Sequence, residues 1–348
     1  MRVKWIYCVL LAFLSFHSLT FAQGKSEGRK NKQKKEQQIF VANWNLENLF
    51  DTADDPLKND EEFLPEGANQ WTNEKLDTKF SNLAKVIRSM NQENGPDLLG
   101  VEEVENRGLL DTLITRHFKD KNYKVAYADC PDNRGIDIGI IYNADKLHFL
   151  KQHTDTVKLQ ENYPTRLILS AGFLLNKKDT LYVYVNHWPS RRGGENESDK
   201  NREAAASVLK NDIEGLLRKS KNSNLLILGD FNDEPSDPSL NKTLGAADCG
   251  CDPAANVRSD LYNLAYQKHT AKEGSFFYQG NWNMLDNIIA SQNLFNNHYK
   301  CGSFEVYKPE FMVTRNGKFK GAPFPTYGGK RYLGGYSDHF PVTALLFF

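Results

Sequence analysis

The sequence predicts an α/β protein in which two packed β-sheets are covered by helices, rather than one doubly wound sheet. Nine runs of apolar and β-branched residues have the length of strands, and two stretches between them repeat apolar residues at helical spacing. From Ile39 to Phe348 no linker or internal repeat interrupts the chain. We therefore expect residues 39–348 to form a single domain.

The expected strands are bounded by turn-forming or polar residues, and several are apolar on both faces, as buried strands are. In chain order they are Ile39–Asn45, Leu98–Glu103, Lys124–Ala128, Asp137–Tyr142, Leu167–Leu175, Leu181–His187, Asn224–Gly229, Leu285–Ala290 and Pro341–Phe347. Periodicity alone does not assign each strand to a sheet.

Two helices are predicted from apolar residues that recur every three or four positions. The first begins after a Thr72/Asn73 capping signal, and its stripe consists of Leu76, Phe80, Leu83, Ile87 and Met90. The second spans Asp199–Lys219, with a stripe of Ala206, Leu209, Ile213 and Leu216. It connects two expected strands that both end in polar motifs.

The first 22 residues have the pattern of a secretory signal peptide. Arg2 and Lys4 precede an apolar run from Trp5 to Leu14, and small residues follow up to Ala22. The apolar run is too short for a transmembrane anchor. We expect an exported monomer, periplasmic or secreted, with no integral membrane segment after cleavage.

Residues 23–38 are predicted to be a basic, disordered tether, because they offer no apolar side chain to bury. The tether could bind nucleic acid or an anionic surface, although we favour a solvated linker. The whole chain has 44 basic and 44 acidic residues; without the leader and the tether, 36 basic and 42 acidic residues remain, a formal charge of −6. This balance excludes a general polyanion-binding surface, so local cations and a bound metal must hold any phosphate.

Four cysteines remain after the predicted leader, namely Cys130, Cys249, Cys251 and Cys301. Their spacing does not match a zinc site, and three disulfide pairings are possible. Export permits disulfides, so we expect at most a structural role.

Short polar motifs follow or precede the apolar runs throughout the chain. They are Asn43-Trp-Asn-Leu-Glu-Asn48, Gly100-Val-Glu-Glu-Val104, Asn186-His-Trp-Pro189, Gly229-Asp-Phe-Asn-Asp233, Leu285-Asp-Asn-Ile-Ile289 and Tyr336-Ser-Asp-His-Phe-Pro341. Strand ends that carry carboxylates, carboxamides and imidazoles can meet in one cleft. This set of groups is typical of a metal-assisted phosphoester hydrolase.

In this order the motifs resemble the endonuclease/exonuclease/phosphatase superfamily, which includes deoxyribonuclease I, exonuclease III, inositol-polyphosphate 5-phosphatases and neutral sphingomyelinases. The resemblance covers almost the whole chain after the tether, and it is to deoxyribonuclease I-like and exonuclease III-like members in a secreted bacterial subgroup. It implies a four-layer α/β/β/α sandwich of two mixed sheets flanked by helices. It also implies a divalent cation at one end, usually Mg²⁺, with Mn²⁺ or Ca²⁺ as alternatives.

Asn45 and Glu103 end two early strands and offer the hard oxygen ligands that Mg²⁺ prefers. In the family the matching glutamate is the main metal ligand, the asparagine lies beside it, and Glu47 matches a further acidic ligand of some members. Glu102 should point to the opposite face of the strand from Glu103, and Glu105 lies past the end of the expected strand. We therefore expect both to be solvated surface charges.

Asp230 and Asn232 in Gly-Asp-Phe-Asn are spaced to point to one side of an extended segment, with Phe231 turned into the core. A carboxylate here can hold or deprotonate an attacking water, and a carboxamide can stabilise charge on a phosphoryl oxygen. The family resemblance implies these roles. A turn-forming pair is the alternative, because Asp233 and two prolines follow.

His187 and His339 each stand at the end or the beginning of an expected strand. In the family the Asp338-His339 dipeptide supplies a metal-side carboxylate and a phosphate-contacting base, and Asp286 orients that histidine. His187 matches a histidine that acts as an acid or a phosphate ligand. Which histidine is the acid and which is the base stays open.

Arg166 opens a strand and matches a position at which the family places an arginine on the phosphate, as a planar fork suits. Arg134 and Asp137 resemble a motif beside the cleft in bacterial members. We expect Arg134 to contact substrate, with a surface salt bridge as the alternative for this pair.

The segment Tyr307–Gly335 alternates basic and aromatic residues and should form a loop at the cleft rim, where it could stack on bases or grip a lipid headgroup. The aromatic residues from Phe276 to Trp282 could enter a nucleic-acid groove or join the core. The sequence predicts an Mg²⁺-dependent nuclease acting on DNA or RNA. The alternatives are a sphingomyelinase-like headgroup or small-phosphoester hydrolase and, less favoured, an inactive binding protein.

Overall fold

The computed structural model describes residues 36–159, 163–191, 195–252 and 258–348. The predicted signal peptide and nearly all of the predicted tether lie outside the described residues. The part from Glu36 to Phe348 is one compact unit by its internal contacts.

The first sheet has six strands in the order β14-β17-β1-β2-β4-β3. Their bounds are β1 Gln38–Leu49, β2 Leu98–Val104, β3 Tyr123–Ala128, β4 Asp137–Asn143, β14 Glu305–Val306 and β17 Val342–Phe347. The two central strands β1 and β2 are parallel, while β17 and β4 flank them in the antiparallel sense. The first and last strands of the described chain are therefore hydrogen-bonded neighbours.

The second sheet has seven strands in the order β5-β6-β7-β8-β13-β10-β9. Their bounds are β5 His148–Asp155, β6 Ile168–Leu175, β7 Asp179–His187, β8 Asn224–Asp230, β9 Ala246–Ala247, β10 Leu261–Asn263 and β13 Asp286–Ser291. Here β7 and β8 are parallel, and β13 runs antiparallel to β8.

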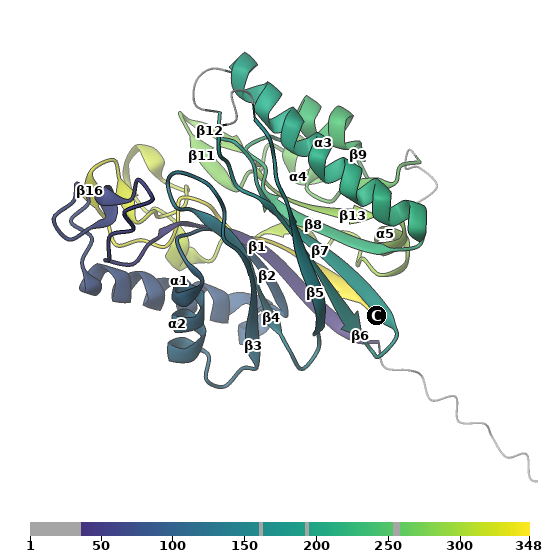
Figure 1. The fold of residues 1–348 in the computed structure, drawn as a ribbon, viewed down its shortest axis with the longest axis horizontal. Coiled ribbons are helices and arrows are strands. Elements are labelled where there is room, and N and C mark those ends of the chain that lie inside the picture. The colour runs from purple at the N-terminus through teal and green to yellow at the C-terminus, as the bar shows by residue number, and fades with distance from the viewer. Residues whose placement is uncertain (1–35, 160–162, 192–194, 253–257) are drawn as a thin grey trace, which may run out of the picture. The chain divides into compact units, whose positions relative to one another are not determined.

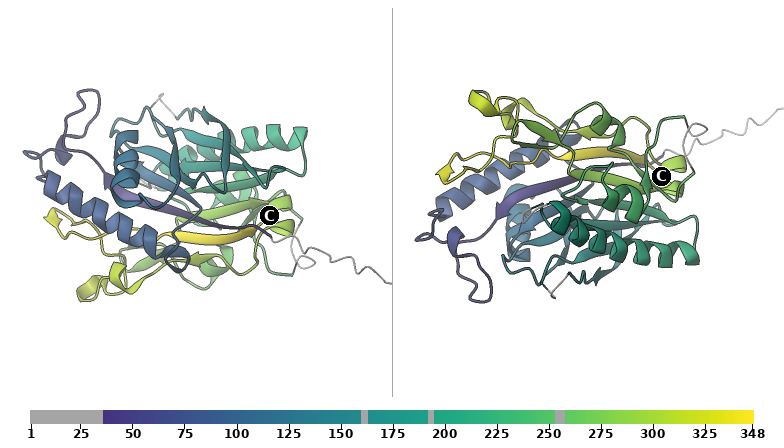
Figure 2. Two further views of the ribbon diagram at one scale, coloured as in Figure 1. Left: turned by 90° about the horizontal axis from the view of Figure 1, so that it is seen from below. Right: turned by 90° about the horizontal axis from the view of Figure 1, so that it is seen from above.

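Helices cover the outer faces of the two sheets, which pack against each other in the middle (Figure 1). Helices α1 (Asn73–Glu93) and α2 (Arg107–His117) lie on the first sheet, and α3 (Glu195–Lys219) lies along the second, as the two further views also show (Figure 2). The shorter helices are α4 Tyr266–Thr270 and α5 Gln292–Asn297. This arrangement confirms the predicted four-layer α/β/β/α sandwich.

The core consists of two layers of buried apolar side chains. The larger cluster fills the space between the sheets and beneath α1 and α2, and it includes Val101, Val185 and Leu228. The smaller cluster lies between the second sheet and α3, where Leu209 and Ile213 pack with Ile227. Alternate residues of β7 and β8 thus face opposite cores, which explains why these strands are apolar on both faces.

All nine predicted strands and both predicted helices are present, with Thr72 as the N-cap residue of α1. Strand β5 and helix α2 were not predicted. Seven of the eight residues of β5 are exposed at the sheet edge, so burial imposes no apolar pattern on it. Two further hairpins, β11 (Phe276–Tyr278) with β12 (Asn281–Asn283) and β15 (Tyr327–Gly328) with β16 (Arg331–Tyr332), project from the connections.

A disulfide joins Cys251 to Cys301, while Cys130 and Cys249 are buried free thiols. Of the three ways to pair the four cysteines, the structure agrees with the one that joins Cys251 to Cys301, but Cys130 and Cys249 are not joined. In the described part of the chain, no helix is both long and apolar enough to cross a bilayer.

Strand direction brings the polar motifs to one end of both sheets. The carboxyl ends of β7 and β8 lie beside the amino end of β13, with His187 paired to Asp230 and Asp230 paired to Asp286 in the register. In the first sheet, the carboxyl end of β1 meets the amino end of β17, with Asn43 opposite Val342. Side chains that are distant in sequence are thereby aimed at one place.

Candidate active site

Asp230 lies at the centre of this end of the sandwich. Its buried Oδ2 is 3.1 Å from Asn45 Nδ2, 3.8 Å from His187 Nε2 and 3.9 Å from His339 Nε2. Its Oδ1 accepts a 2.9 Å hydrogen bond from the Asn232 backbone N–H. Burial raises the pKa of Asp230 to about 6, even though His339 acts to lower it. The two longer separations leave space for a water or a phosphoryl oxygen between these groups.

His339 is held in a fixed orientation by a chain of polar contacts. Its Nδ1 lies 2.7 Å from Asp286 Oδ2, and Ser275 Oγ donates to the same carboxylate oxygen. Its backbone N–H donates to Ser337 Oγ, and its ring stacks on Phe276 with centroids 4.7 Å apart. The predicted Asp286–His339 pairing is therefore present, and it directs Nε2 towards Asp230.

His187 occupies a different electrostatic environment. Its Nε2 is 3.9 Å from Glu103 Oε1, and its Nδ1 is buried without a hydrogen-bond partner. Burial, together with the positive charges of Arg166 and Arg134, lowers the pKa of His187 well below its usual range.

The environment of His339 has the opposite effect on its proton affinity. Burial alone would lower the pKa of His339, but the carboxylates of Asp286 and Asp230 outweigh it and raise the pKa well above its usual range. The surroundings thus shift the pKa values of the two histidines in opposite directions.

Three acidic side chains gather on the first-sheet side of Asp230. Glu103 lies near the end of β2, Glu47 lies near the end of β1, and Asp338 lies shortly before β17. Burial, and then repulsion by Glu47, raises the pKa of Asp338 to about 7. Lys79 of α1 is completely buried beside them, with Nζ 3.8 Å from Glu47 Oε2. One ammonium opposes three carboxylates, so the cluster has an excess of negative charge.

Glu47 is tied to the segment that precedes the last strand. Its Oε2 accepts a 2.6 Å hydrogen bond from the Thr326 backbone N–H, and its Oε1 accepts one from Tyr327. Lys79 Nζ donates to Thr326 Oγ1 and to the Tyr336 carbonyl. Of the three predicted carboxylate ligands, Glu47 accepts the most hydrogen bonds from the described residues and therefore has the fewest lone pairs left for a cation.

The donor set fits a hard divalent cation. Among the described residues, no three Asp, Glu, His or Cys side chains at this end have ligand atoms within 4.8 Å of one another. A cation here would contact one or two carboxylates directly, from Glu103 and Asp338, with the amide oxygen of Asn45 and water completing its shell. Mg²⁺ is usually bound in this way.

The backbone is strained where the polar side chains leave the strands. Glu47, Asn48, Glu103 and Asn232 have φ values of 53°, 54°, 59° and 51°, in the left-handed region that non-glycine residues rarely adopt. Such conformations cluster at functional sites, where the surrounding structure enforces them. Glu47, Asn48 and Glu103 lie near the ends of β1 and β2, where the pairing register shifts, and Asn232 follows the end of β8.

The prediction that Asp230 and Asn232 share one side of an extended segment is wrong. Strand β8 ends at Asp230, and the left-handed conformation of Asn232 turns the chain. Asn232 Nδ2 donates a 3.0 Å hydrogen bond to the Trp188 carbonyl. Phe231 is buried, as predicted, and packs edge-on against Trp188.

Glu102 and Glu105 are not solvated surface charges, contrary to the prediction. Glu102 is completely buried, and its Oε2 accepts a 3.3 Å hydrogen bond from Asn43 Nδ2. Burial raises its pKa well above the usual range. Glu105 is half-buried and accepts a hydrogen bond from the Asp51 backbone N–H. The second sheet covers the face of β2 that carries Glu102, which the alternation of one strand does not reveal.

The two arginines that were predicted to bind substrate differ in how many hydrogen bonds their guanidinium groups already form within the protein. Arg166 donates to the carbonyls of His187 and Trp188 and pairs with Asp132 at 3.0 Å, so it braces the loop after β7. Arg134 donates one 2.7 Å hydrogen bond to Asn48 Oδ1. Arg134 therefore has more donors available for a phosphate, and it forms no salt bridge with the buried Asp137, the alternative considered for this pair.

A cavity of about 270 Å³ adjoins the acidic cluster. Its lining includes Glu47, Asn48, Arg134, Trp71 and Tyr327. It contains one arginine, aromatic faces and several amide or carbonyl groups, a mixture that suits a small polar group attached to a phosphate.

The predicted basic, aromatic rim is present in part. Thr326 and Tyr327, in the middle of the segment Tyr307–Gly335, contact Glu47, and Phe319 is exposed. In the aromatic hairpin, Phe276 packs on His339 and Tyr278 is exposed. Packing therefore occurs for Phe276, while contact of the exposed Tyr278 and Phe319 with a substrate stays a prediction.

Lys79 and Ser275 are site residues that the sequence reasoning missed. Lys79 falls within the apolar stripe of α1, between Leu76 and Leu83, and a charge in such a stripe is a signal that could have identified it. Ser275 lies in an irregular segment, and only its contact with Asp286 reveals its part in the site.

Comparison with known proteins agrees with this architecture. The sequence profile described as "Endonuclease/Exonuclease/phosphatase family" matches residues 40–347. No curated protein sequence matched significantly.

Solved structures with the same fold include an endonuclease/exonuclease/phosphatase family protein from Bacteroides thetaiotaomicron, with 17% identity, 90% of this chain and 96% of that chain covered, and a TM-score of 0.56. A mannosyl-6-phosphatase of the same organism has 17% identity, coverage of 89% and 100%, and a TM-score of 0.56. TDP2 of D. rerio, complexed with a single-strand DNA product, has 13% identity, coverage of 89% and 98%, and a TM-score of 0.52. The match over nearly the whole described chain shows that this protein belongs to the endonuclease/exonuclease/phosphatase family.

Proposed function

We propose that this protein is an exported, Mg²⁺-dependent phosphodiesterase that hydrolyses DNA or RNA. The observation that carries the proposal is the convergence of Asn45, His187 and His339 on Asp230 Oδ2, with Asp286 behind His339. This constellation can position a water, accept its proton and stabilise charge on a phosphoryl group. The signal-like pattern of residues 1–22 supports export.

The chain's own groups account for proton transfer and orientation. Asp230 is the proposed acceptor for the proton of the attacking water, with its carboxylate held by Asn45 and by the Asn232 backbone. Protonated His339 would donate to a phosphoryl or leaving-group oxygen, and neutral His187 could accept a proton or contact the phosphate. A divalent cation held by Glu103 and Asp338 would supply Lewis-acid stabilisation of the phosphoryl charge.

The free donors of Arg134 support its role as the substrate-phosphate ligand. Arg166, whose guanidinium is already engaged, would contribute mainly by holding the His187 loop. A nucleic-acid substrate is compatible with the exposed aromatic side chains Tyr278 and Phe319, on which bases could stack. The structurally similar TDP2 has been solved with a single-strand DNA product, which also supports a nucleic-acid substrate.

A small phosphoester is the second candidate, and the 270 Å³ cavity beside Arg134 favours it. This volume suits a sugar-sized group better than a nucleic-acid strand, and the negative charge of the predicted domain offers no broad electrostatic attraction for a polyanion. A mannosyl-6-phosphatase shares the fold.

The test is hydrolysis of several substrates by purified residues 23–348. Supercoiled plasmid, single-stranded RNA, sphingomyelin and a sugar 6-phosphate are each incubated with Mg²⁺, Mn²⁺, Ca²⁺ or EDTA. His339→Ala removes the proposed donor, and His148→Ala is the matched control because His148 is exposed on β5.

We expect cleavage of plasmid or RNA in Mg²⁺, its loss in EDTA and in His339→Ala, and full activity in His148→Ala. Phosphate release from the sugar ester with intact nucleic acid would establish the second candidate instead. Headgroup release from sphingomyelin alone would place the enzyme among lipid hydrolases. Inactivity on all four substrates would contradict both proposed functions.

A further inference from the structure

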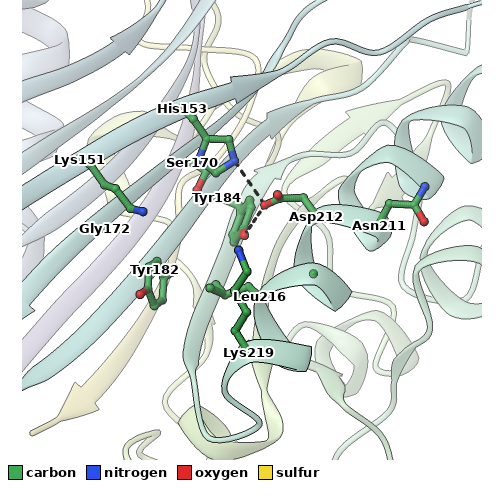
Figure 3. A pocket seen from close by; sticks show the side chains of 11 residues that line it. Lys151, His153, Ser170, Gly172, Tyr182, Tyr184, Asn211, Asp212, Leu216 and Lys219 are labelled. Carbon is green, nitrogen blue, oxygen red and sulfur yellow. Dashed lines mark hydrogen bonds and ion pairs between the residues drawn. The ribbon is translucent and has the colours of Figure 1, made fainter.

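A second cluster of metal-ligand side chains lies under α3, on the outer face of the second sheet. His153 and Asp155 belong to β5, and Asp212 of α3 lies close to His153, as the close view shows (Figure 3). Strands β6 and β7 separate β5 from β8, whose end carries Asp230. In the described parts of the chain, this is the one trio of His, Cys, Asp or Glu residues whose ligand atoms all lie within 4.8 Å of one another.

The distances within the trio match those between the ligands of a tetrahedral ion. His153 Nε2 lies 3.4 Å from Asp212 Oδ2 and 3.5 Å from Asp155 Oδ2. A tetrahedral Zn²⁺ with bonds of about 2.0–2.1 Å keeps its ligand atoms about 3.3 Å apart. A direct hydrogen bond between imidazole and carboxylate would be about 0.5 Å shorter than these separations. Two of the three separations thus match the spacing of metal ligands, and the ligand atoms of all three residues lie within 4.8 Å of one another.

The trio carries an excess of negative charge, because two carboxylates share one imidazole. Asp155 Oδ2 is a buried atom, and His153 Nε2, 3.5 Å away, is more distant than in a direct hydrogen bond. Lys151 and Lys219 line the same cavity, but neither ammonium lies within ion-pair distance of Asp155 or Asp212 in the described structure. A cation at the centre of the trio would neutralise both carboxylates.

The Asp212 carboxylate is held in place by a hydrogen bond from a neighbouring strand. The Tyr184 hydroxyl of β7 donates a 2.7 Å hydrogen bond to Asp212 Oδ2, as the close view shows (Figure 3). Such outer contacts fix the direction of metal-binding carboxylates. The cavity beside the trio has a volume of about 170 Å³, which leaves room for a water or another small ligand.

We propose that His153, Asp155 and Asp212 form a second metal site, selective for a first-row divalent cation such as Zn²⁺, with water as the fourth ligand. An imidazole with two carboxylates favours Zn²⁺ over Mg²⁺, whereas the all-oxygen set around Glu103 has the opposite preference. The ion would link β5, an exposed edge strand, to α3, the helix that covers its sheet. Metal binding would thereby stabilise this edge of the fold.

The test is a titration of chelator-treated residues 23–348 with Co²⁺, which reports tetrahedral coordination by its visible absorption. Excess Mg²⁺ is present throughout, so that the oxygen-rich site at the strand ends is filled. His153→Ala and Asp155→Asn remove a ligand, with the second keeping the side-chain shape. His148→Ala, on the same strand, is the matched control. Circular dichroism and the melting temperature verify that each variant is folded.

We expect one equivalent of tetrahedral Co²⁺ in the wild type and in His148→Ala, displaced by Zn²⁺, and none in the two ligand variants. Tyr184→Phe should weaken binding by about 10-fold, because it releases Asp212. Zn²⁺ at 100 times its dissociation constant should raise the Tm of the wild type by about 5 °C. A folded wild type without tetrahedral Co²⁺, or equal binding in folded His153→Ala, would overturn the proposal.

Discussion

The Asn45 side-chain amide donates a 3.1 Å hydrogen bond to Asp230 Oδ2, so a strand of one sheet orients the central carboxylate of the other. Asn45 lies on β1 and Asp230 ends β8, and both side chains are buried. Packing of the two sheets is thus a condition for the active-site geometry.

Asn45→Ala should reduce kcat by about 10–100-fold, because Asp230 loses the donor that fixes the oxygen facing both histidines. KM should change less, since the arginines are untouched. The measurement is steady-state hydrolysis of the substrate identified above, with exposed Asn222→Ala as the control. An unchanged kcat in a folded Asn45→Ala variant would show that this contact does not orient the carboxylate.

Asp286→Asn should lower kcat by about 100-fold or more while leaving the fold intact, because an amide can hold the ring in the wrong tautomer. The wild-type carboxylate lies 2.7 Å from His339 Nδ1. Nuclear magnetic resonance of the imidazole should show a lower pKa for His339 in the variant, since Asp286 is a main cause of its increase. A lower kcat with an unchanged pKa of His339 would contradict this explanation, because Asp286 would then support catalysis by a route other than the His339 imidazole.

Lys79→Ala should destabilise the protein by about 3–5 kcal/mol, because Glu47 would remain buried with its backbone donors but without its nearby ammonium. Urea unfolding measures the change. Lys75→Ala, four residues earlier on the same helix and partly exposed, is the control. The double variant Lys79→Met with Glu47→Gln should recover part of the lost free energy of unfolding, because it removes both charges. No recovery would show that lost side-chain packing, and not the unpaired charge of Glu47, causes the destabilisation.

The pH dependence of stability should include a contribution from Asp137. Burial raises its pKa to about 6, so the folded protein holds this proton more tightly than the unfolded chain. The associated stability is complete below about pH 4 and disappears as the pH rises through 6. Asp137→Asn cannot titrate, so its unfolding free energy relative to the wild type should increase by about 1–3 kcal/mol between pH 4 and pH 7.

Denaturant unfolding at a series of pH values measures this difference. Asn keeps an acceptor for the Cys130 backbone N–H that Asp137 now binds at 2.7 Å. Asp129→Asn is the matched control, because Asp129 is exposed nearby. Parallel pH profiles of the wild type and Asp137→Asn would assign the pH dependence to other groups.

The sequence by itself determined most of the buried elements of the fold and most of the residues of the site. Buried strands such as β7 and β8 need apolar residues on both faces, and the stripe of α1 must face a core, so both leave periodic patterns. The exposed strand β5 leaves no such pattern because solvent accepts any polar side chain. The polar motifs at the strand ends, together with the family resemblance, predicted Asp230, Asp286 and His339 as neighbours, although Asp230 and Asp286 lie on the second sheet and His339 precedes a strand of the first.

Only the tertiary structure decided what each of these groups does, because charge, burial and hydrogen bonding are properties of neighbours distant in sequence. Glu102 is buried because a second sheet covers it, and Arg166 is engaged because two carbonyls of the His187 loop reach it. The pKa values of the two histidines shift in opposite directions because Asp286 pairs directly with His339, whereas burial and the nearby arginines dominate at His187. No local pattern encodes these differences, since each depends on residues that the fold alone brings within a few ångströms.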